Sequence, residues 1–232
     1  RWHWLVKNHR ERDDYRQIVA LNKAFSLTGP ELQSALVDVI DVDQWLRTFA
    51  VMRLFGNRDF YSQPSGYQGH WRHNFQAYVR PEDNRVLVLP WDIDESFQIS
   101  TSSTIFGVGN VTKLIQLPDN LHYYYGHLDD LMTASFNTEY MDAWKDHYGE
   151  LLKIDLSRNV NYITSRVEYV RSQLPAKLAF ELKTQDQTIN DSQATLSGAG
   201  WVNVREIRLA DSLQPIDAIW TSPTTWEAVI PV

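Results

Sequence analysis

Residues 86–94 read VLVLPWDID, a continuous apolar run followed by a Pro-Trp pair and two carboxylates, Asp92 and Asp94. A short apolar run of this kind predicts a buried β-strand. Residues 75–79 alternate between apolar and polar side chains and predict a second strand. Residues 81–84, which lie between the two runs, are of turn-forming types. The sequence therefore predicts a β-hairpin that ends in two closely spaced carboxylates.

The clearest helical pattern of the sequence precedes this hairpin and covers residues 41–56. Its apolar side chains recur at the spacing of a single helix face. Asp41 and Gln44 have the spacing of a capping box, and Gly56 is a suitable C-terminal stop. Two further helices are expected before it, over residues 13–25 and 28–40.

The sequence after the hairpin changes character twice. Residues 96–120 are rich in Ser, Thr, Gly and Asn, and a loop is expected there. Helical periodicity then returns and stops at Pro175; the expected helices cover 124–136, 140–152 and 157–174. After about Leu182 the periodicity is lost and short β-like runs follow, at 201–204, 207–209, 218–220 and 226–230.

These patterns predict the α+β class. Residues 1–180 are expected to form a mostly helical domain that contains the β-hairpin. Residues 183–232 are expected to form a small β-sandwich-like module, shorter than the roughly 100 residues of a complete sandwich. Its three tryptophans most simply fill the core of that module, with stacking on sugar rings as the alternative; they are Trp201, Trp220 and Trp226.

Composition narrows the classes of function. The chain has 232 residues and a net charge of −7, which argues against a nucleic-acid partner. It has no cysteine, which excludes zinc–thiolate sites and thiol nucleophiles. No stretch is apolar and long enough to predict a membrane span. The apolar ends of the chain predict a piece of a larger protein. Secretion or a cell-envelope location is our expectation, with the cytoplasm as the alternative.

Oxygen-bearing side chains stand at the ends of three predicted elements. Asp59 follows the helix at 41–56, Asn74 opens the hairpin, and Asp92 and Asp94 close it. Carboxylate and amide oxygens suit Mg²⁺, Mn²⁺ or Ca²⁺ rather than zinc. A catalytic Asp, a metal-binding Asn and a metal-binding Asp occur in this order in protein kinases. Considered one at a time, Asp59 could cap a turn, and the hairpin carboxylates could be solvated loop residues.

Several segments resemble the CotH kinase family, which is named for a spore-coat protein. They are IDVDQWL (40–46), GNRD (56–59), HNF (73–75) and, as the most similar of them, LPWDIDESF (89–97). The resemblance covers roughly Val6 to Leu174. That family resembles a divergent branch of the protein-kinase fold, with members that phosphorylate Ser residues of proteins.

The resemblance implies roles for four residues. Asp59 would be the catalytic carboxylate, and Asn74 and Asp92 would bind the metal and the nucleotide. Asp94 would be a second metal ligand or a structural carboxylate. The implied cofactors are ATP with Mg²⁺ or Mn²⁺, with Ca²⁺ as a further option, and the implied partner is a protein bearing Ser or Thr. The sequence departs from the family pattern in the long insertion between Asp59 and Asn74.

Three functions remain open at this point. The leading one is an atypical, metal-dependent Ser/Thr protein kinase, whose amino-terminal lobe is largely absent from this chain, so the chain alone is not expected to phosphorylate a substrate. The second is an inactive, kinase-like binding or scaffold module of a cell-envelope protein, whose β module would bind carbohydrate or another cell-surface partner. The third is a metal-dependent phosphohydrolase.

Overall fold

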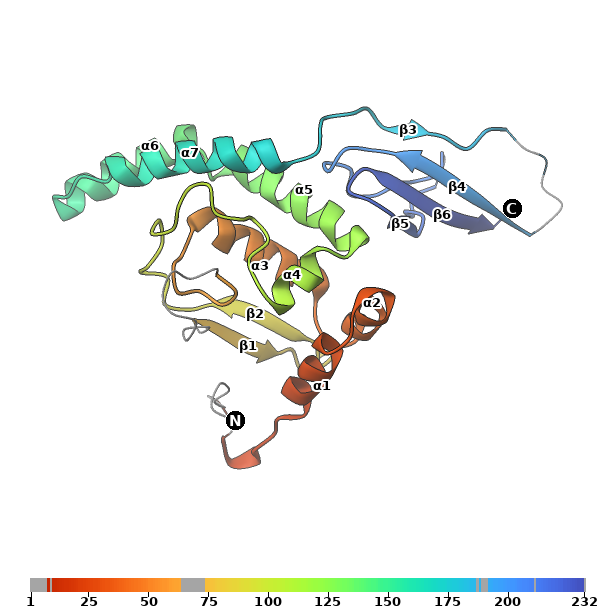
Figure 1. The fold of residues 1–232 in the computed structure, drawn as a ribbon, viewed down its shortest axis with the longest axis horizontal. Helices are drawn as coiled ribbons and strands as arrows, with labels where there is room; N and C mark the ends of the chain where they lie inside the picture. The colour runs from red at the N-terminus through yellow and green to blue at the C-terminus, as the bar shows by residue number, and fades with distance from the viewer. Residues whose placement is uncertain are drawn as a thin grey trace. The chain divides into compact units, whose positions relative to one another are not determined.

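A computed structural model of the chain describes residues 8, 10–63, 74–186, 188, 192–210 and 212–231 (Figure 1). Helices and two antiparallel sheets make up this part of the chain, which confirms the α+β class. The chain divides into two compact units, Arg1–Leu114 and Ile115–Val232.

In its described part, the first unit combines four α-helices with the predicted hairpin. After a 3-10 turn at Arg10–Arg12, its helices are α1 (Arg16–Phe25), α2 (Gly29–Val37), α3 (Val42–Phe55) and the short α4 (Asn110–Ile115), which reaches the boundary. Its strands are β1 (Phe75–Val79) and β2 (Val86–Pro90), paired antiparallel with Phe75 opposite Pro90. The three helices and the hairpin that were expected before residue 96 are thereby confirmed.

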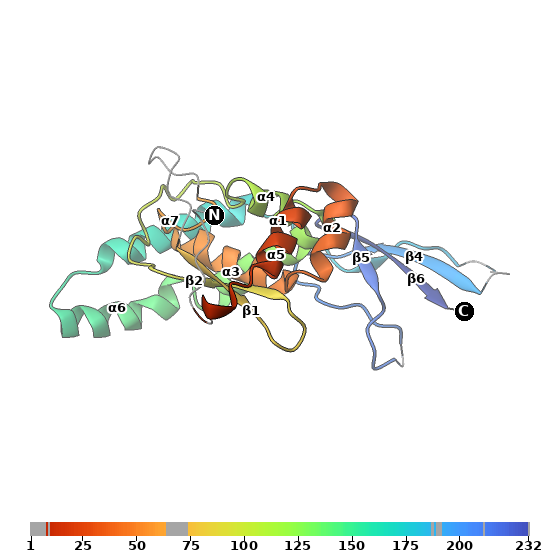
Figure 2. The same cartoon turned by 90° about the horizontal axis from the view of Figure 1, so that it is seen from below.

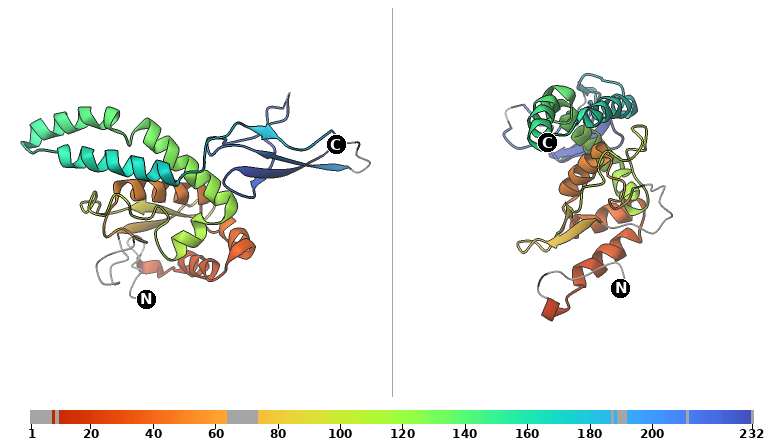
Figure 3. Two further views of the ribbon diagram at one scale, coloured as in Figure 1. Left: turned by 45° about the horizontal axis from the view of Figure 1, so that its top comes forward. Right: turned by 90° about the vertical axis from the view of Figure 1, so that its left-hand side faces the viewer.

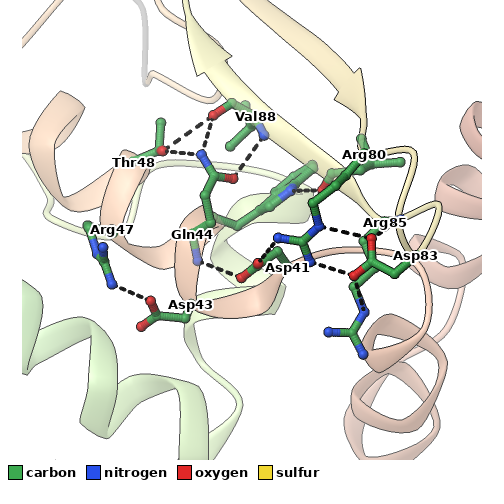
Figure 4. Close-up of polar contacts among 11 residues, drawn as sticks. Asp41, Asp43, Gln44, Arg47, Thr48, Arg80, Asp83, Arg85 and Val88 are labelled. Carbon is green, nitrogen blue, oxygen red and sulfur yellow. Dashed lines mark hydrogen bonds and ion pairs between the residues drawn. The ribbon is translucent and has the colours of Figure 1, made fainter.

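The ends of α3 follow from local sequence, whereas the role of Gln44 does not. Asp41 caps the helix by accepting a hydrogen bond from the Gln44 backbone N–H (3.1 Å), and Gly56 ends it in the left-handed conformation (φ 59°). The expected capping box is wrong, because the Gln44 amide instead spans the backbone of Val88 (Figure 4). It accepts from the Val88 N–H at 3.0 Å and donates to the Val88 carbonyl at 2.6 Å.

The outer edge of β2 is thus sealed by groups that do not belong to a strand. Besides Gln44, the indole N–H of Trp45 donates to the Val86 carbonyl (2.7 Å), and the Val39 carbonyl accepts from the Val86 N–H (2.8 Å). Backbone polar groups near a core need such partners. The position of the hairpin relative to α3 is therefore set by hydrogen bonds as well as by packing.

An aromatic-rich core lies under α3. The ring centroid of Trp45 is 5.9 Å from that of Phe25 and 6.0 Å from that of Phe49, and Phe49 is 5.6 Å from Phe60. All four side chains are buried. Because Phe60 belongs to the loop after α3, this core fixes that loop as well as the helix.

Arg80 ties the turn of the hairpin to the start of α3. Its guanidinium binds Asp41 at 2.9 Å and Asp83 at 2.5 Å (Figure 4). The hydrogen bond from Arg80 lowers the pKa of Asp83 to about 2. The turn end of the hairpin is thereby anchored to the start of α3.

The loop expected over residues 96–120 is partly wrong. It contains α4 and the first residues of α5 (Pro118–Ala134). The Ser, Thr and Gly content of the segment concealed a few apolar side chains, Val111, Leu114 and Ile115, which are fully buried. Pro118 occupies the first turn of α5, where a missing N–H costs nothing.

The second unit begins with three helices and ends with a sheet. After α5 come α6 (Thr138–Leu152) and α7 (Ser157–Gln173), which lie antiparallel and side by side (Figure 3). These confirm the last two expected helices, and α5 starts six residues before the expected 124. Among the helices that the structure describes, none is both long enough and apolar enough to cross a membrane.

The sheet of the second unit has the strand order β3-β4-β6-β5, antiparallel throughout. Its strands are β3 (Glu181–Leu182), β4 (Gln193–Ala199), β5 (Ala218–Trp220) and β6 (Thr225–Pro231), and Figure 2 shows β4 beside β6. The runs at 218–220 and 226–230 are confirmed as strands. The chain-terminal residue, also expected in this last strand, lies outside the described residues.

Two expected strands are wrong, and the strands β3 and β4 were not predicted. Residues 201–204 form a turn closed by the Val204 N–H and the Trp201 carbonyl (2.9 Å). In the run at 207–209, only Arg208 pairs, in an isolated bridge with Pro215. β4 escaped notice because its sequence, QATLSGA, is dominated by small and polar residues. Small residues suit β4 because bulky side chains pack against the strand, such as Trp226 of β6 against Gly198.

The three tryptophans of the module are buried, which confirms the core interpretation. Trp201, Trp220 and Trp226 are 6%, 2% and 1% exposed. Gly198 makes room for one of them, since a Cβ atom at that position would lie 2.4 Å from the Trp226 ring. Rings in this position are not open to stacking on a sugar.

Polar contacts bind α5 to the sheet within the second unit. The Asp119 carboxylate accepts from the Trp220 N–H (2.9 Å). His122 is fully buried and stacks on Trp220, with 3.3 Å between ring centroids. Its two ring nitrogens lie 2.8 Å from the Pro223 carbonyl oxygen and 2.7 Å from that of Val204. α5 is therefore part of the same body as the β module.

Candidate functional site

The open end of the hairpin brings together the two segments that carry its polar residues. Because β1 and β2 are antiparallel and Phe75 pairs with Pro90, the residue before β1 and the residue after β2 are opposite each other. The Trp91 N–H continues the ladder by donating to the Asn74 carbonyl (3.1 Å). Asp92 comes next along the chain, so Asn74 and Asp92 belong to the same end of the hairpin.

Asp59 reaches that end from α3. Its backbone N–H donates to the side-chain oxygen of Asn57 (3.1 Å), which is fully buried and so fixes the turn after the helix. The Asn74 side-chain amide then donates to the Asp59 carboxylate at 2.7 Å. Asp59 is half-buried, and Asn74 is 8% exposed. The structure therefore places Asn74 in direct contact with Asp59, although 15 positions separate them in sequence.

Asp92 and Asp94 lie on the surface beside this contact. Both are exposed, and neither carboxylate hydrogen-bonds to any residue within the described ranges. Their oxygens thus remain available to a ligand from solvent. No contact between Asp59 and either of these carboxylates is observed, and the link between the segments runs through Asn74 and Trp91.

The backbone of this region is unusual. Among the described residues around the site, four other than glycine adopt left-handed φ angles: Ser62 (66°), Asn74 (62°), Asp92 (55°) and Phe97 (63°). Asn and Asp tolerate this conformation better than most residues, and Phe does not. Backbone strain of this kind concentrates at functional sites, where the surrounding structure holds it in place.

The donor set suits a hard divalent cation bound together with phosphates. Among the described residues, no group of three or more His, Asp or Glu side chains gathers as a complete metal cage. Mg²⁺ does not require one, because one or two carboxylates suffice when phosphate oxygens and water fill the remaining positions. Asp92 offers a carboxylate, and the amide oxygen of Asn74 is left over after its nitrogen has bound Asp59. The residues therefore fit such an ion.

Sequence reasoning missed three charged residues near the site. Arg58 forms an ion pair with Glu95 (2.7 Å), and both residues lie within segments that the sequence had singled out. Arg53 is fully buried in α3, and its guanidinium binds the carbonyl and the hydroxyl of Ser62, each at 2.6 Å. The signal for Arg58 and Glu95 was their position next to Asp59 and Asp94. A buried Arg53 had no sequence signal beyond an unusual place on the apolar side of a helix.

Histidine is another common metal ligand, and the sequence has His70 and His73 between Asp59 and Asn74. His70 and His73 lie outside the described residues. His122 is buried under the β module, where it contacts carbonyl oxygens rather than carboxylates.

Comparison with known proteins supports one family. No curated protein matches this chain. The family model described as CotH kinase protein matches residues 5–198, which include α1–α7, the hairpin and the first strands of the β module. The matched part contains Asp59, Asn74, Asp92 and Asp94. Since the match covers most of the sequence and includes the whole polar end of the hairpin, the chain belongs to the CotH kinase family.

Proposed function

We propose that this chain belongs to a metal-dependent protein kinase that transfers the γ-phosphoryl group of ATP to a Ser or Thr hydroxyl of a protein. The observation that supports this most directly is the 2.7 Å contact from Asn74 to Asp59 at the end of the hairpin. It joins a candidate catalytic carboxylate to Asn74, whose backbone pairs with Trp91 just before the two exposed carboxylates. Membership of a kinase family favours phosphoryl transfer as the chemistry.

In this proposal each residue has a separate task. Asp59 orients the acceptor hydroxyl and takes its proton, and the amide of Asn74 holds the Asp59 carboxylate in place. The oxygens of Asp92 and Asn74 would hold a Mg²⁺ or Mn²⁺ ion, with Asp94 as a further ligand. When bound there, ATP with its metal ion would supply the phosphoryl group and the charge neutralisation that the transition state needs. The protein contributes mainly by positioning these groups.

Two substitutions in the intact protein test these tasks. Asp92→Asn removes a charged metal ligand, and we expect it to abolish nearly all phosphoryl transfer and the stabilisation by ATP that requires Mg²⁺ or Mn²⁺. Asp59→Asn should keep metal-dependent nucleotide binding while turnover falls. The matched control is Glu82→Gln, a carboxylate in the exposed turn of the hairpin. Transfer of labelled phosphate to protein and thermal shift with nucleotide are the two measurements.

The outcomes separate the three functions. Full transfer activity in either Asp variant would reject the role assigned to that residue. Nucleotide-independent melting of the wild-type protein, with no transfer, would favour a binding or scaffold module. Release of free phosphate without a phosphorylated protein would instead indicate a phosphohydrolase.

A further inference from the structure

Two segments that flank the candidate site run alongside each other. One is the end of α3 with the loop to Asp59, and the other is the segment that follows Asp94. Their backbones are joined by four hydrogen bonds, from Arg58 N–H to Glu95 O (2.9 Å), Phe97 N–H to Phe55 O (2.7 Å), Gln98 N–H to Gly56 O (3.2 Å) and Ile99 N–H to Gly56 O (3.3 Å). The Phe55 and Phe97 rings also meet edge to face, 5.8 Å apart.

One ion pair lies at the end of this ladder nearest the site. Arg58 Nη2 is 2.7 Å from Glu95 Oε2, and the two side chains are 40% and 32% exposed. At this exposure water screens the pair, so its direct contribution to the stability of the fold is small. The pair matters instead through its position in the sequence. Arg58 is the residue before Asp59, and Glu95 is the residue after Asp94.

We propose that the Arg58–Glu95 ion pair is a positioning clamp that keeps the candidate site assembled without any covalent modification. This rests on the proposed function for its catalytic consequence. The pair and the backbone bond beside it fix the loop of Asp59 against the Asp92–Asp94 segment. Neither Arg58 nor Glu95 touches the substrate in this proposal.

In this proposal the site needs no phosphorylation, because Arg58 is already paired with Glu95. Five hydroxyl residues, Ser100 to Thr104, follow the clamped segment, and Ser100 and Ser102 are exposed. A phosphate on such a segment would order it by pairing with an arginine. Here Arg58 is already paired with a carboxylate built into the chain. A phosphorylated hydroxyl that paired with Arg58 would have to displace Glu95, so in this proposal the ion pair takes the place of such a modification.

The test compares Glu95→Gln, Arg58→Gln and the reversed pair Arg58→Glu with Glu95→Arg in the intact protein. We expect each single change to lower kcat by about twofold to fivefold with little change in KM, as suits the loss of an exposed ion pair, and the reversed pair to recover part of the loss. Wild-type protein treated with a phosphatase should keep its activity. The matched control is Asp43→Asn, which breaks an exposed ion pair with Arg47 inside α3.

A second readout does not depend on activity. Amide hydrogen exchange of the metal-free protein should speed up at residues 95–99 in Glu95→Gln and stay unchanged there in Asp43→Asn. If the wild type transfers no phosphate but exchange responds as expected, the clamp stands and the proposed function fails. The clamp is overturned if exchange is unaffected, if the reversed pair recovers nothing, or if dephosphorylated wild type is inactive.

Discussion

At the scale of single residues, Gln44 fixes the hairpin through hydrogen bonds from its side chain to the backbone of β2. Its amide satisfies both backbone groups of Val88, which no strand pairs on that side. We expect Gln44→Ala to lower the free energy of unfolding by about 1–3 kcal/mol, because the Val88 N–H loses its partner and the Val88 carbonyl keeps only the longer contact from the Thr48 hydroxyl (3.4 Å). Urea unfolding followed by tryptophan fluorescence measures this change.

The control for this prediction is Gln33→Ala in α2. Gln33 is also half-buried, and its side chain forms no hydrogen bond with any described residue. An equal loss of stability in the two variants would mean that the contacts of Gln44 with Val88 contribute nothing beyond the packing of a glutamine.

At the scale of elements, the junction between α5 and the β module should respond to pH. Burial lowers the pKa of His122, while its contacts with the Val204 and Pro223 carbonyls oppose that shift. Other ionisable groups near the ring are Asp119 and Tyr123 of α5, together with Arg205 and Asp217. Because the folded state resists protonation of His122, the unfolded state binds more protons below a pH of about 6.5. The second unit should therefore lose stability as the pH falls through that range.

The melting temperature, measured between pH 7.5 and 5.5, tests this prediction. The variant His122→Asn removes the titrating group. The control is His147→Asn, which changes a histidine on the exposed surface of α6. The loss below pH 6.5 should be weaker in His122→Asn alone. A neutral imidazole can donate to only one of the two carbonyls. If stability rises as the pH falls, the two acceptors outweigh burial and the imidazolium is the form that the fold prefers.

The elements also show how far sequence reasoning reaches. The start and end of α3 were predictable because Asp41 and Gly56 act on backbone within a few residues. The partner of Gln44 was not, because Val88 lies 44 positions away and only the folded chain brings them together. The same applies to the Asn74–Asp59 contact, for which the sequence indicated the polar residues and the hairpin but not the bond between them.

The β module shows the opposite failure, in which local pattern misleads. Trp201 to Val204 alternates like a strand, yet the segment is a turn, because Trp201 is fixed elsewhere: its indole N–H donates to the Pro175 carbonyl (2.9 Å). In β4, by contrast, Gly198 and its small neighbours carry no strand signal, and pairing with β6 decides the structure. Tertiary contacts thus override local preference in both cases.

At the scale of the whole molecule, we propose that residues 183–232 form a β module that depends on α5 for its stability. Its core residue Trp220 is covered by His122, and a Cβ atom at Gly126 of α5 would lie 2.5 Å from the Val202 carbonyl oxygen. The module and the helix are therefore closely packed, and α5 falls in the same compact unit as the sheet.

Limited proteolysis of the whole chain tests this dependence. We expect the first cut between β3 and β4, because residues before β3 are held by the Trp201 contact with Pro175 and by Lys177 over the Trp201 ring (4.7 Å). The two pieces should co-elute on gel filtration, since contacts of α5 and pairing of β3 survive the cut. The nicked variant His122→Ala should separate into its pieces more readily. Early cutting within α6 or α7, or separation of the wild-type pieces, would contradict the proposed dependence.

The sealed edge of β2 has a consequence for colloidal behaviour. The strand VLVLP carries no charge and has strong β-propensity, a combination that invites strands of other molecules to add and begin an aggregate. Addition requires unpaired N–H and C=O groups along an edge. Val39, Gln44 and Trp45 hydrogen-bond these groups on Val86 and Val88. While α3 is packed against the hairpin, this edge of β2 therefore offers no unpaired groups to a strand of another molecule. Any condition that detaches α3 from the hairpin would therefore lower the solubility of the chain before it unfolds completely.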